Sequence, residues 1–310
     1  MLLAALSGAA LGYPDRPVRL IVPYPPGQAT DIVARVIAQK LAARLGQHFV
    51  VDNRSGAAAI LGHEIAMKAA PDGYTLLMSS SGPLAINPGL YSKLPYDSLK
   101  DFDMIGRATI VPQFLVVNPG VPAASVRDLV ELAKSKPGQL SYATGGAGQT
   151  NHLIMELFRS AAGIDVLHVP FKGSVAAVTD VIAGRIQMMF ETGAASLPHV
   201  RSSRLRALAV SSIKRSPAAP EIPTVAESGF PGFDNVAWIC LIAPKGTPQA
   251  VIMKLNAQMR SALEQQDVRD TFANVGTEPA PTTPQELREF VVAEIAKWGR
   301  AVKQSGAKIE

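Results

Sequence analysis

Residues 18–31 read Val-Arg-Leu-Ile-Val-Pro-Tyr-Pro-Pro-Gly-Gln-Ala-Thr-Asp, and this stretch decides the fold. Its first five residues are mostly apolar and predict a buried strand. Apolar residues then recur at helical spacing over residues 30–45, with Gly46 as the expected C-cap. The helix N-terminus that follows Gly27 presents unpaired N–H groups and a partial positive charge. The stretch therefore predicts an α/β unit whose glycine-bearing turn suits an anion.

The same arrangement occurs again near the middle of the chain. Residues 144–152 read Thr-Gly-Gly-Ala-Gly-Gln-Thr-Asn-His, after a strand-like segment at 140–143 and before a helix expected over 149–162. Glycines let a ligand approach the backbone closely. Two such turns far apart in the sequence predict two lobes that close on one anionic ligand.

Strand-like and helix-like segments alternate along the chain. The first part contains strands expected at 18–22, 49–51 and 74–78 and helices at 30–45 and 60–69. A second alternation has strands at 140–143, 166–169, 187–190 and 206–211 and helices at 149–162, 174–183 and 194–202. This order implies parallel sheets with right-handed crossovers. We expect an α/β fold of two lobes, each a mostly parallel sheet flanked by helices, with the ligand in the interlobe cleft.

Two crossings between the lobes are expected, near residues 105–118 and 225–240. A strand over 236–243 returns the chain to the first lobe, and helices at 248–263, 267–273 and 284–303 pack against that lobe. The first lobe is therefore expected to comprise residues 13–115 and 237–310, and the second residues 116–236.

The composition excludes several classes of protein. The chain has 310 residues, of which 47% are hydrophobic and 18% charged, so a folded two-domain protein is expected rather than a disordered one. The net charge of +5 comes from scattered Lys and Arg without a basic run, which argues against nucleic-acid binding. The single cysteine, Cys240, excludes an intramolecular disulfide and a cysteine-based zinc site, and its apolar neighbours favour a packed core thiol.

Familiar catalytic motifs are missing from the sequence. There is no Gly-x-Ser-x-Gly and no Gly-Lys-Ser/Thr, and the pair His63-Glu64 has no second histidine at zincin spacing. The run Gly146-Ala147-Gly148 lacks the third glycine of a dinucleotide fingerprint. We therefore expect no catalytic residues, no metal and no cofactor. A hydrolase that uses His152 with a nearby Ser or Thr is a distant alternative.

The N-terminus indicates export. Residues 1–12 are small and apolar and end in Ala10-Leu11-Gly12, which is typical of the end of a signal peptide with cleavage before Tyr13. A basic segment does not precede this stretch, so we expect the true translation start to lie upstream. A frayed N-terminal helix is the alternative.

Candidate ligand-binding residues lie in both turns and after two further strands. Thr30 and Thr150 are possible N-caps or hydroxyl donors to a ligand, whereas Asp31 suits a structural role in the first helical turn. His152 either orients the second turn from within its helix or faces the ligand, and Lys172 either adds a cation to the site or is solvated. The candidates are Tyr24, Pro26, Gly27, Gln28, Thr30 and Asp31; Ser79, Ser80 and Ser81 in a flexible turn; Gly145, Gly146, Ala147, Gly148, Thr150 and His152; and Lys172, Gly173 and Ser174.

Several stretches in order resemble one family. They are residues 13–27, 52–56, 70–77, 141–153, 168–174, 206–211, 223–232 and 293–298. From Tyr13 onward the chain resembles the Bug family, the extracytoplasmic solute receptors of tripartite tricarboxylate transporters.

The resemblance implies a periplasmic, two-lobed, type II solute-binding fold without enzymatic activity. It implies a small carboxylate ligand, such as a di- or tricarboxylate, an amino acid or an aromatic acid, held by residues 24–31 and 145–150, partly through water. It also implies delivery to the membrane subunits of a tripartite tricarboxylate transporter, by a receptor that we expect to be a monomer. A sensor subunit of the same fold that signals to a receptor kinase is the alternative.

Two positions depart from the family pattern. Gln28 follows Gly27 where the family usually has a second glycine, so its amide either donates to the ligand or narrows the cleft. Ala57-Ala58-Ala59 stands where the family often has glycines, which we expect to stiffen the start of the following helix.

Overall fold

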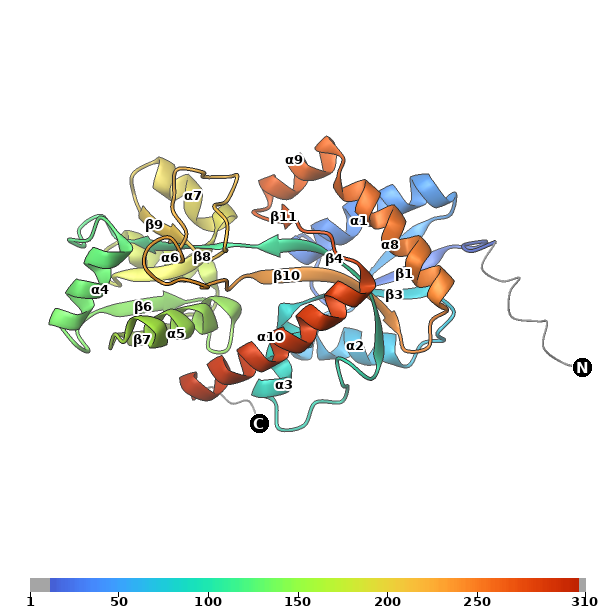
Figure 1. Cartoon of the computed structure of the whole chain (residues 1–310), viewed down its shortest axis with the longest axis horizontal. Coiled ribbons are helices and arrows are strands. Elements are labelled where there is room, and N and C mark those ends of the chain that lie inside the picture. Colours follow the sequence, from blue (N-terminus) through green and yellow to red (C-terminus); the bar gives the residue numbers. More distant parts are fainter. Residues whose placement is uncertain (1–11, 307–310) are drawn as a thin grey trace, which may run out of the picture.

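A computed structural model describes residues 12–306, which form two lobes, each built on one sheet (Figure 1). The strands of the first lobe are β1 (Val18–Val22), β2 (Phe49–Asn53), β3 (Thr75–Ser80), β4 (Phe102–Val111), β10 (Ala237–Pro244) and β11 (Glu278–Pro279), in the order β11-β4-β10-β3-β1-β2. Those of the second lobe are β5 (Gln113–Val117), β6 (Ser141–Thr144), β7 (Leu167–Pro170), β8 (Met188–Thr192) and β9 (Arg206–Val210), in the order β7-β6-β8-β5-β9.

Helices cover both sheets. The first lobe carries α1 (Ala29–Leu45), α2 (Ile60–Met67), α3 (Asn87–Leu90), α8 (Gln249–Leu263), α9 (Gln266–Asn274) and α10 (Pro284–Ser305), with short turns η1 (Ala57–Ala59) and η2 (Gly82–Ile86). The second lobe carries α4 (Val126–Ser135), α5 (Thr150–Ala162), α6 (Ser174–Ile182) and α7 (Gly193–Arg201). The expected strands and longer helices are therefore present within a few residues of their predicted bounds, whereas η2 and α3 were not predicted.

The helix ends follow the capping residues in the sequence. Gly46 and Gly163 end α1 and α5 in the left-handed conformation, as a C-cap glycine does. Ser125 caps α4 by accepting a hydrogen bond from the Asp128 N–H. Thr283 forms a capping box with Glu286 at the start of α10.

Both sheets are mixed, so the expectation of mostly parallel sheets is only partly met. Pairing is parallel where β1 meets β2 and β3, and where β6 meets β7 and β8. The other pairs are antiparallel, and each of them includes β10, β4 or β5. The reason is the crossing between lobes: β4 leads out of the first lobe into β5, while β10 brings the chain back in the opposite direction beside β4 (Figure 1).

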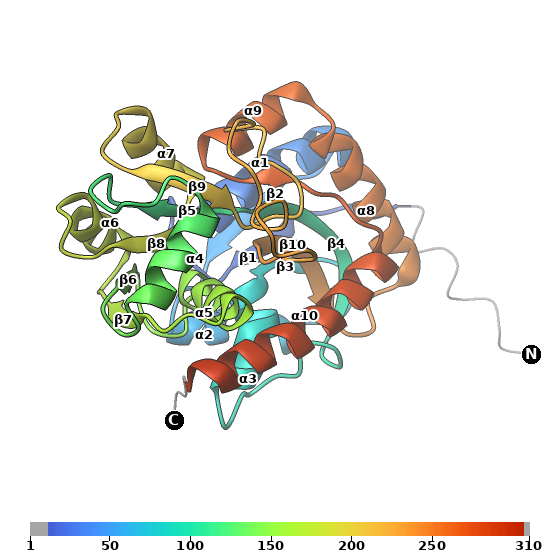
Figure 2. The same cartoon turned by 60° about the vertical axis from the view of Figure 1, so that its left-hand side comes forward.

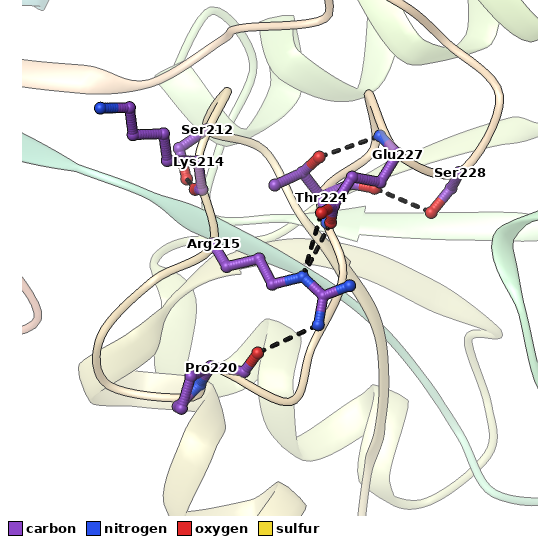
Figure 3. Close-up of polar contacts among 7 residues, drawn as sticks. All are labelled: Ser212, Lys214, Arg215, Pro220, Thr224, Glu227 and Ser228. Carbon is purple, nitrogen blue, oxygen red and sulfur yellow. Dashed lines mark hydrogen bonds and ion pairs between the residues drawn. The ribbon is translucent and has the colours of Figure 1, made fainter.

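The return path to β10 is an ordered loop. Arg215 Nε donates to the Glu227 carboxylate at 2.9 Å, and Arg215 Nη1 donates to the Pro220 carbonyl at 3.2 Å (Figure 3). The Thr224 carbonyl accepts from the Ser228 hydroxyl at 2.8 Å in the same loop. These hydrogen bonds hold residues 215–228 of the loop together before the chain enters β10.

Helix α10 contacts both lobes. It packs on η2, α3 and β4 of the first lobe and against α5 of the second, and Figure 2 shows it running past α3. One hydrophobic core accordingly continues from Trp238 and Trp298 to Phe158 of α5. Cys240 is fully buried in this core, where burial raises the pKa of its thiol, in agreement with the predicted core position.

The expected signal-peptide remnant, residues 1–12, lies outside the described residues except for Gly12. Among residues 12–306, no helix is long and apolar enough to cross a membrane.

Candidate functional site

The first turn joins β1 to α1. Residues 25–28 are its exposed residues, and Gly27 has a φ of 85°, which favours glycine. Gln28 is the N-cap of α1 through its backbone alone, without a side-chain capping bond. The prediction of Thr30 as N-cap is therefore wrong, because the helix begins one residue earlier, at Ala29. Thr30 is buried, and its hydroxyl has no hydrogen-bond partner among the residues that the structure describes.

Asp31 holds the first turn in shape, which agrees with its expected structural role. Its carboxylate accepts hydrogen bonds from the Gly27 N–H, from Arg35 Nε and from Asn53 Nδ2, each at 2.9 Å. The same Asn53 amide also donates to the Tyr24 carbonyl at 3.0 Å. Burial alone would raise the pKa of Asp31, but these hydrogen bonds hold it below the usual value.

The serines at the end of β3 lie beside the first turn. The hydroxyls of Tyr24 and Ser80 share a hydrogen bond of 2.7 Å, and burial raises the pKa of Tyr24. Ser79, Ser80 and Ser81 are all buried, and the chain continues directly into η2. The prediction of a flexible turn at these serines is wrong, because they end a central strand and are covered by the helical segment that follows.

A buried Ser–His pair supports this corner, and sequence reasoning missed it. His63 Nδ1 donates to the Ala59 carbonyl at 2.8 Å, so the neutral ring accepts from the Ser79 hydroxyl at Nε2, at 2.7 Å. Burial lowers the pKa of His63 to about 4, which keeps the ring neutral. Both side chains are fully buried, so a substrate has no access to them. The spacing of 16 residues between them leaves no sequence pattern that identifies the pair.

The three alanines before α2 do not stiffen the helix start as expected. Ala57, Ala58 and Ala59 have φ values of 45°, 50° and 72° and form a left-handed turn. Side chains avoid this region, so the turn is strained. It persists because His63 holds the Ala59 carbonyl and Asn87 Nδ2 donates to the Ala58 carbonyl at 3.1 Å.

The second turn joins β6 to α5. Gly146 and Gly148 have φ values of 153° and 77°, which favour glycine, and Gln149 is the N-cap. Thr150 is the first helical residue and not the N-cap, so this prediction is also wrong. Its hydroxyl has no hydrogen-bond partner within residues 12–306. Ala147 is exposed, whereas Gly145 is buried.

The loop after β7 packs against the second turn. The Gly173 N–H donates to the Gly145 carbonyl at 2.8 Å. A side chain on Gly145 would come 2.6 Å from Gln149 Oε1 and 3.2 Å from the Ser174 N, so the two loops are tightly packed at this glycine. Lys172 is exposed at the edge of this loop. The structure thus places the two predicted glycine-bearing loops of the second lobe together.

The second turn also meets the first lobe. A side chain on Gly148 would come 3.1 Å from Leu90 Cδ1 of α3. A cavity of about 750 Å³ lies elsewhere between the lobes, along α7 and α9, and is lined by neither turn.

The two turns share one chemical property. Each opens a helix whose first N–H groups have no acceptor within the helix, and each is followed by a threonine hydroxyl without a partner in the described part of the chain. Such groups donate hydrogen bonds to an anion. No group of three or more His, Cys, Asp or Glu side chains suited to a metal occurs in residues 12–306.

Comparisons with known proteins agree on one family. The model of the tripartite tricarboxylate transporter family receptor matches residues 33–307. Protein BugT of Bordetella pertussis is 41% identical over 299 residues, which cover 96% of this chain and 92% of that protein.

Solved structures agree with this. Rpa4515 of R. palustris, solved with adipate, is 35% identical with a TM-score of 0.79, covering 96% of this chain and all of that one. MatC of Rhodopseudomonas palustris, with bound malate, is 31% identical with a TM-score of 0.73, covering 94% and 100%. A TctC solute-binding protein from Polaromonas, without ligand, is 25% identical with a TM-score of 0.85, covering 94% and 99%.

Proposed function

The chain belongs to the tripartite tricarboxylate transporter receptor family, whose members are periplasmic solute-binding proteins and not enzymes, and on this premise we propose that it binds a small carboxylate between its lobes. The observation that carries the proposal is the pair of glycine-bearing turns, one in each lobe, that lead into the N-termini of α1 and α5. A carboxylate matches both in charge and in hydrogen-bonding capacity. The adipate and malate of two similar structures support the same ligand class.

The first lobe contributes its turn and the neighbouring serines to the proposed site. The N–H groups of residues 29–31 and the Thr30 hydroxyl are the donors, and the Tyr24–Ser80 pair closes one side. Gln28 is exposed at the edge, where its amide is free to donate to the distal part of a ligand. Asp31 takes part by holding Gly27 and not by touching an anion, which it would repel.

The second lobe contributes residues 145–150. The N–H groups of Gly146 and Ala147 and the Thr150 hydroxyl are its donors, with Lys172 and Ser174 beside them. We place the first crossing between the lobes at Pro112, between β4 and β5 and a few residues before the boundary expected at residue 115, and the second near residue 236, so that closure turns about these two crossings.

Delivery to a transporter completes the proposal. The receptor is exported by an N-terminal signal peptide, acts as a monomer in the periplasm, and passes the carboxylate to the membrane subunits of a tripartite tricarboxylate transporter. Uptake of the labelled ligand by cells that hold these subunits should require this protein. Uptake that is unchanged without it would remove the transport role and leave the binding role to be judged separately.

A thermal-shift screen tests the binding role. The purified protein is heated with mono-, di- and tricarboxylates, aromatic acids and acidic amino acids, and with neutral amides of matched shape, such as adipamide beside adipate. Ligand at a hundred times its Kd adds about 2.7 kcal/mol, which raises the Tm by several degrees in a chain of this size. We expect at least one carboxylate to raise the Tm and its amide to leave it unchanged. Equal shifts with acid and amide, or none with any acid, would contradict the proposal.

A further inference from the structure

The side chain of His152 supports the second turn through a hydrogen bond to the backbone of the turn. The N–H of Gly148 donates to Nδ1 of His152 at 3.1 Å, across four residues at the start of α5. His152 is only 4% exposed, and its own backbone N–H donates to Asn151 Oδ1 at 2.9 Å. Gly148 has a φ of 77°, in the left-handed region. Its N–H therefore points in a different direction from the N–H of a residue in a right-handed helix. The contact therefore fixes the backbone of the last glycine of the turn.

Accepting this hydrogen bond defines the state of the ring. Nδ1 carries no proton, so the neutral imidazole holds its proton on Nε2. An imidazolium, or the other neutral tautomer, has a proton on Nδ1 and points it at the Gly148 N–H. Either change replaces an attraction between the ring and the turn by a clash of two donors.

The groups around His152 hold its ring in a stack and favour its neutral form. It stacks on His168 of β7 with ring centroids 4.0 Å apart, and His168 stacks on Tyr142 of β6 at 4.9 Å. The charged groups near the stack are Glu156 and Arg159 of α5, which pair with each other at 2.8 Å. Burial, His168 and Arg159 together lower the pKa of His152 to about 4.

The stack connects the turn to two strands. His168 Nε2 and the Thr144 hydroxyl share a hydrogen bond of 2.7 Å. Thr144, the last residue before the turn, is therefore held by the stack formed by the rings of His152, His168 and Tyr142. At the other end of this stack of rings, the Tyr142 hydroxyl donates a hydrogen bond to Glu156 Oε1. The turn is thereby held at Thr144 before its glycines and at Gly148 after them.

We propose that His152, as the neutral Nε2-protonated tautomer, is a positioning residue that holds the second turn in the shape that receives the ligand carboxylate. The N–H groups of Gly146 and Ala147 have no acceptor among the described residues, so both stay available to the ligand while Nδ1 holds Gly148. Protonation of His152 releases Gly148 and weakens ligand binding. The inference rests on the proposed function for its effect on affinity, but the state of the ring is a property of the ligand-free protein.

Two conservative variants separate the two ring nitrogens. In His152→Asn the side-chain oxygen replaces Nδ1 and still accepts from Gly148, whereas in His152→Gln the amide group replaces Nε2 and the acceptor for Gly148 is lost. Calorimetric titration with adipate and with L-malate as probes at pH 7.5 should give affinities within about threefold of the wild type for His152→Asn. For His152→Gln we expect a loss of at least tenfold. The reverse order would overturn the inference, because it would make Nε2 the nitrogen that acts on the ligand.

Nitrogen NMR of the ligand-free protein provides the second readout. We expect an unprotonated Nδ1 and a protonated Nε2 on His152 at pH 7, and a Gly148 amide signal that moves with the same pH midpoint as this ring. A protonated Nδ1, or a Gly148 signal that ignores the titration of the ring, would overturn the inference. If the NMR result holds but neither probe nor any other carboxylate of the screen binds the wild type, the proposed function fails and the positioning of the turn by His152 stands.

Discussion

The carboxylate of Asp31 accepts a hydrogen bond from the backbone N–H of Gly27 at 2.9 Å, so a residue in the first turn of α1 closes the turn that precedes the helix. In the second lobe, Gly148 is held in the same way by His152, also four residues further along the chain. In each lobe, a side chain within the helix fixes the glycine before it and leaves the outer N–H groups free. The two lobes thus fix the glycine of the turn by the same kind of hydrogen bond, with an aspartate in one lobe and a histidine in the other.

Removing the Asp31 side chain should destabilise the protein. In Asp31→Ala, the Gly27 N–H and the Asn53 amide lose their acceptor in a buried site, so we expect a loss of about 2–4 kcal/mol in the free energy of unfolding. The matched control is Arg35→Ala, which removes the half-exposed partner and should cost less than about 1 kcal/mol. Urea denaturation measures both, and equal losses would contradict the role given to Asp31.

The Thr150 hydroxyl should contribute to ligand binding. Thr150→Val keeps the shape of the side chain and removes its donor, so the affinity for the carboxylate should fall by about 1–3 kcal/mol. Thr271→Val, on an exposed face of α9, is the control and should leave the affinity unchanged. An unchanged Kd for Thr150→Val would remove this residue from the site.

Glycine should be favoured over alanine at position 58. The left-handed conformation of Ala58 costs about 1 kcal/mol, which Ala58→Gly avoids, with part of the gain offset by the freer unfolded chain. We expect Ala58→Gly to raise the free energy of unfolding by about 0.5–1 kcal/mol. Ala293→Gly, at an exposed position of the right-handed helix α10, should instead lower it by about 1 kcal/mol. A loss at both positions would show that the turn is not strained.

Stability should fall as the solution becomes mildly acidic. The pKa values of His63 and His152 are lowered by burial from 6.5 to about 4, so the unfolded chain binds protons that the folded protein does not. This contribution is complete above pH 6.5 and is lost as the pH falls toward 4, at about 2 kcal/mol for each histidine by pH 5. Urea denaturation at pH 7 and pH 5 measures the loss, and His152→Asn should lose about 2 kcal/mol less than the wild type. A variant that loses as much as the wild type would contradict the shifted pKa of His152.

Much of the fold follows from local sequence. Gly27 in the first turn and Gly46 at the end of α1 mark element ends that depend only on neighbouring residues, and both are where the sequence predicts them. The antiparallel strands were not predicted, because the direction of β4 and β10 is set by pairing between segments that are more than a hundred positions apart. Local patterns of apolar residues carry no such information.

The sequence predicted the two turns of the candidate site but not the side-chain contacts that hold them in place. Glycine spacing identifies both turns, since close approach and positive φ require that residue. The contacts Tyr24–Ser80, His63–Ser79 and His152–His168 join residues 16 or more positions apart, so each depends on the packing of complete elements. The threonines were misplaced as N-caps because Gln28 and Gln149 cap through the backbone alone, which leaves no mark in the side-chain pattern.

A crystal structure of the protein with the carboxylate that gives the largest thermal shift tests the central claim most directly. We predict one carboxylate group within hydrogen-bond distance of N–H groups from both residues 27–31 and residues 145–150, with the lobes closed over it. A carboxylate held by one lobe alone, or seated in the cavity along α7 and α9, would contradict the account.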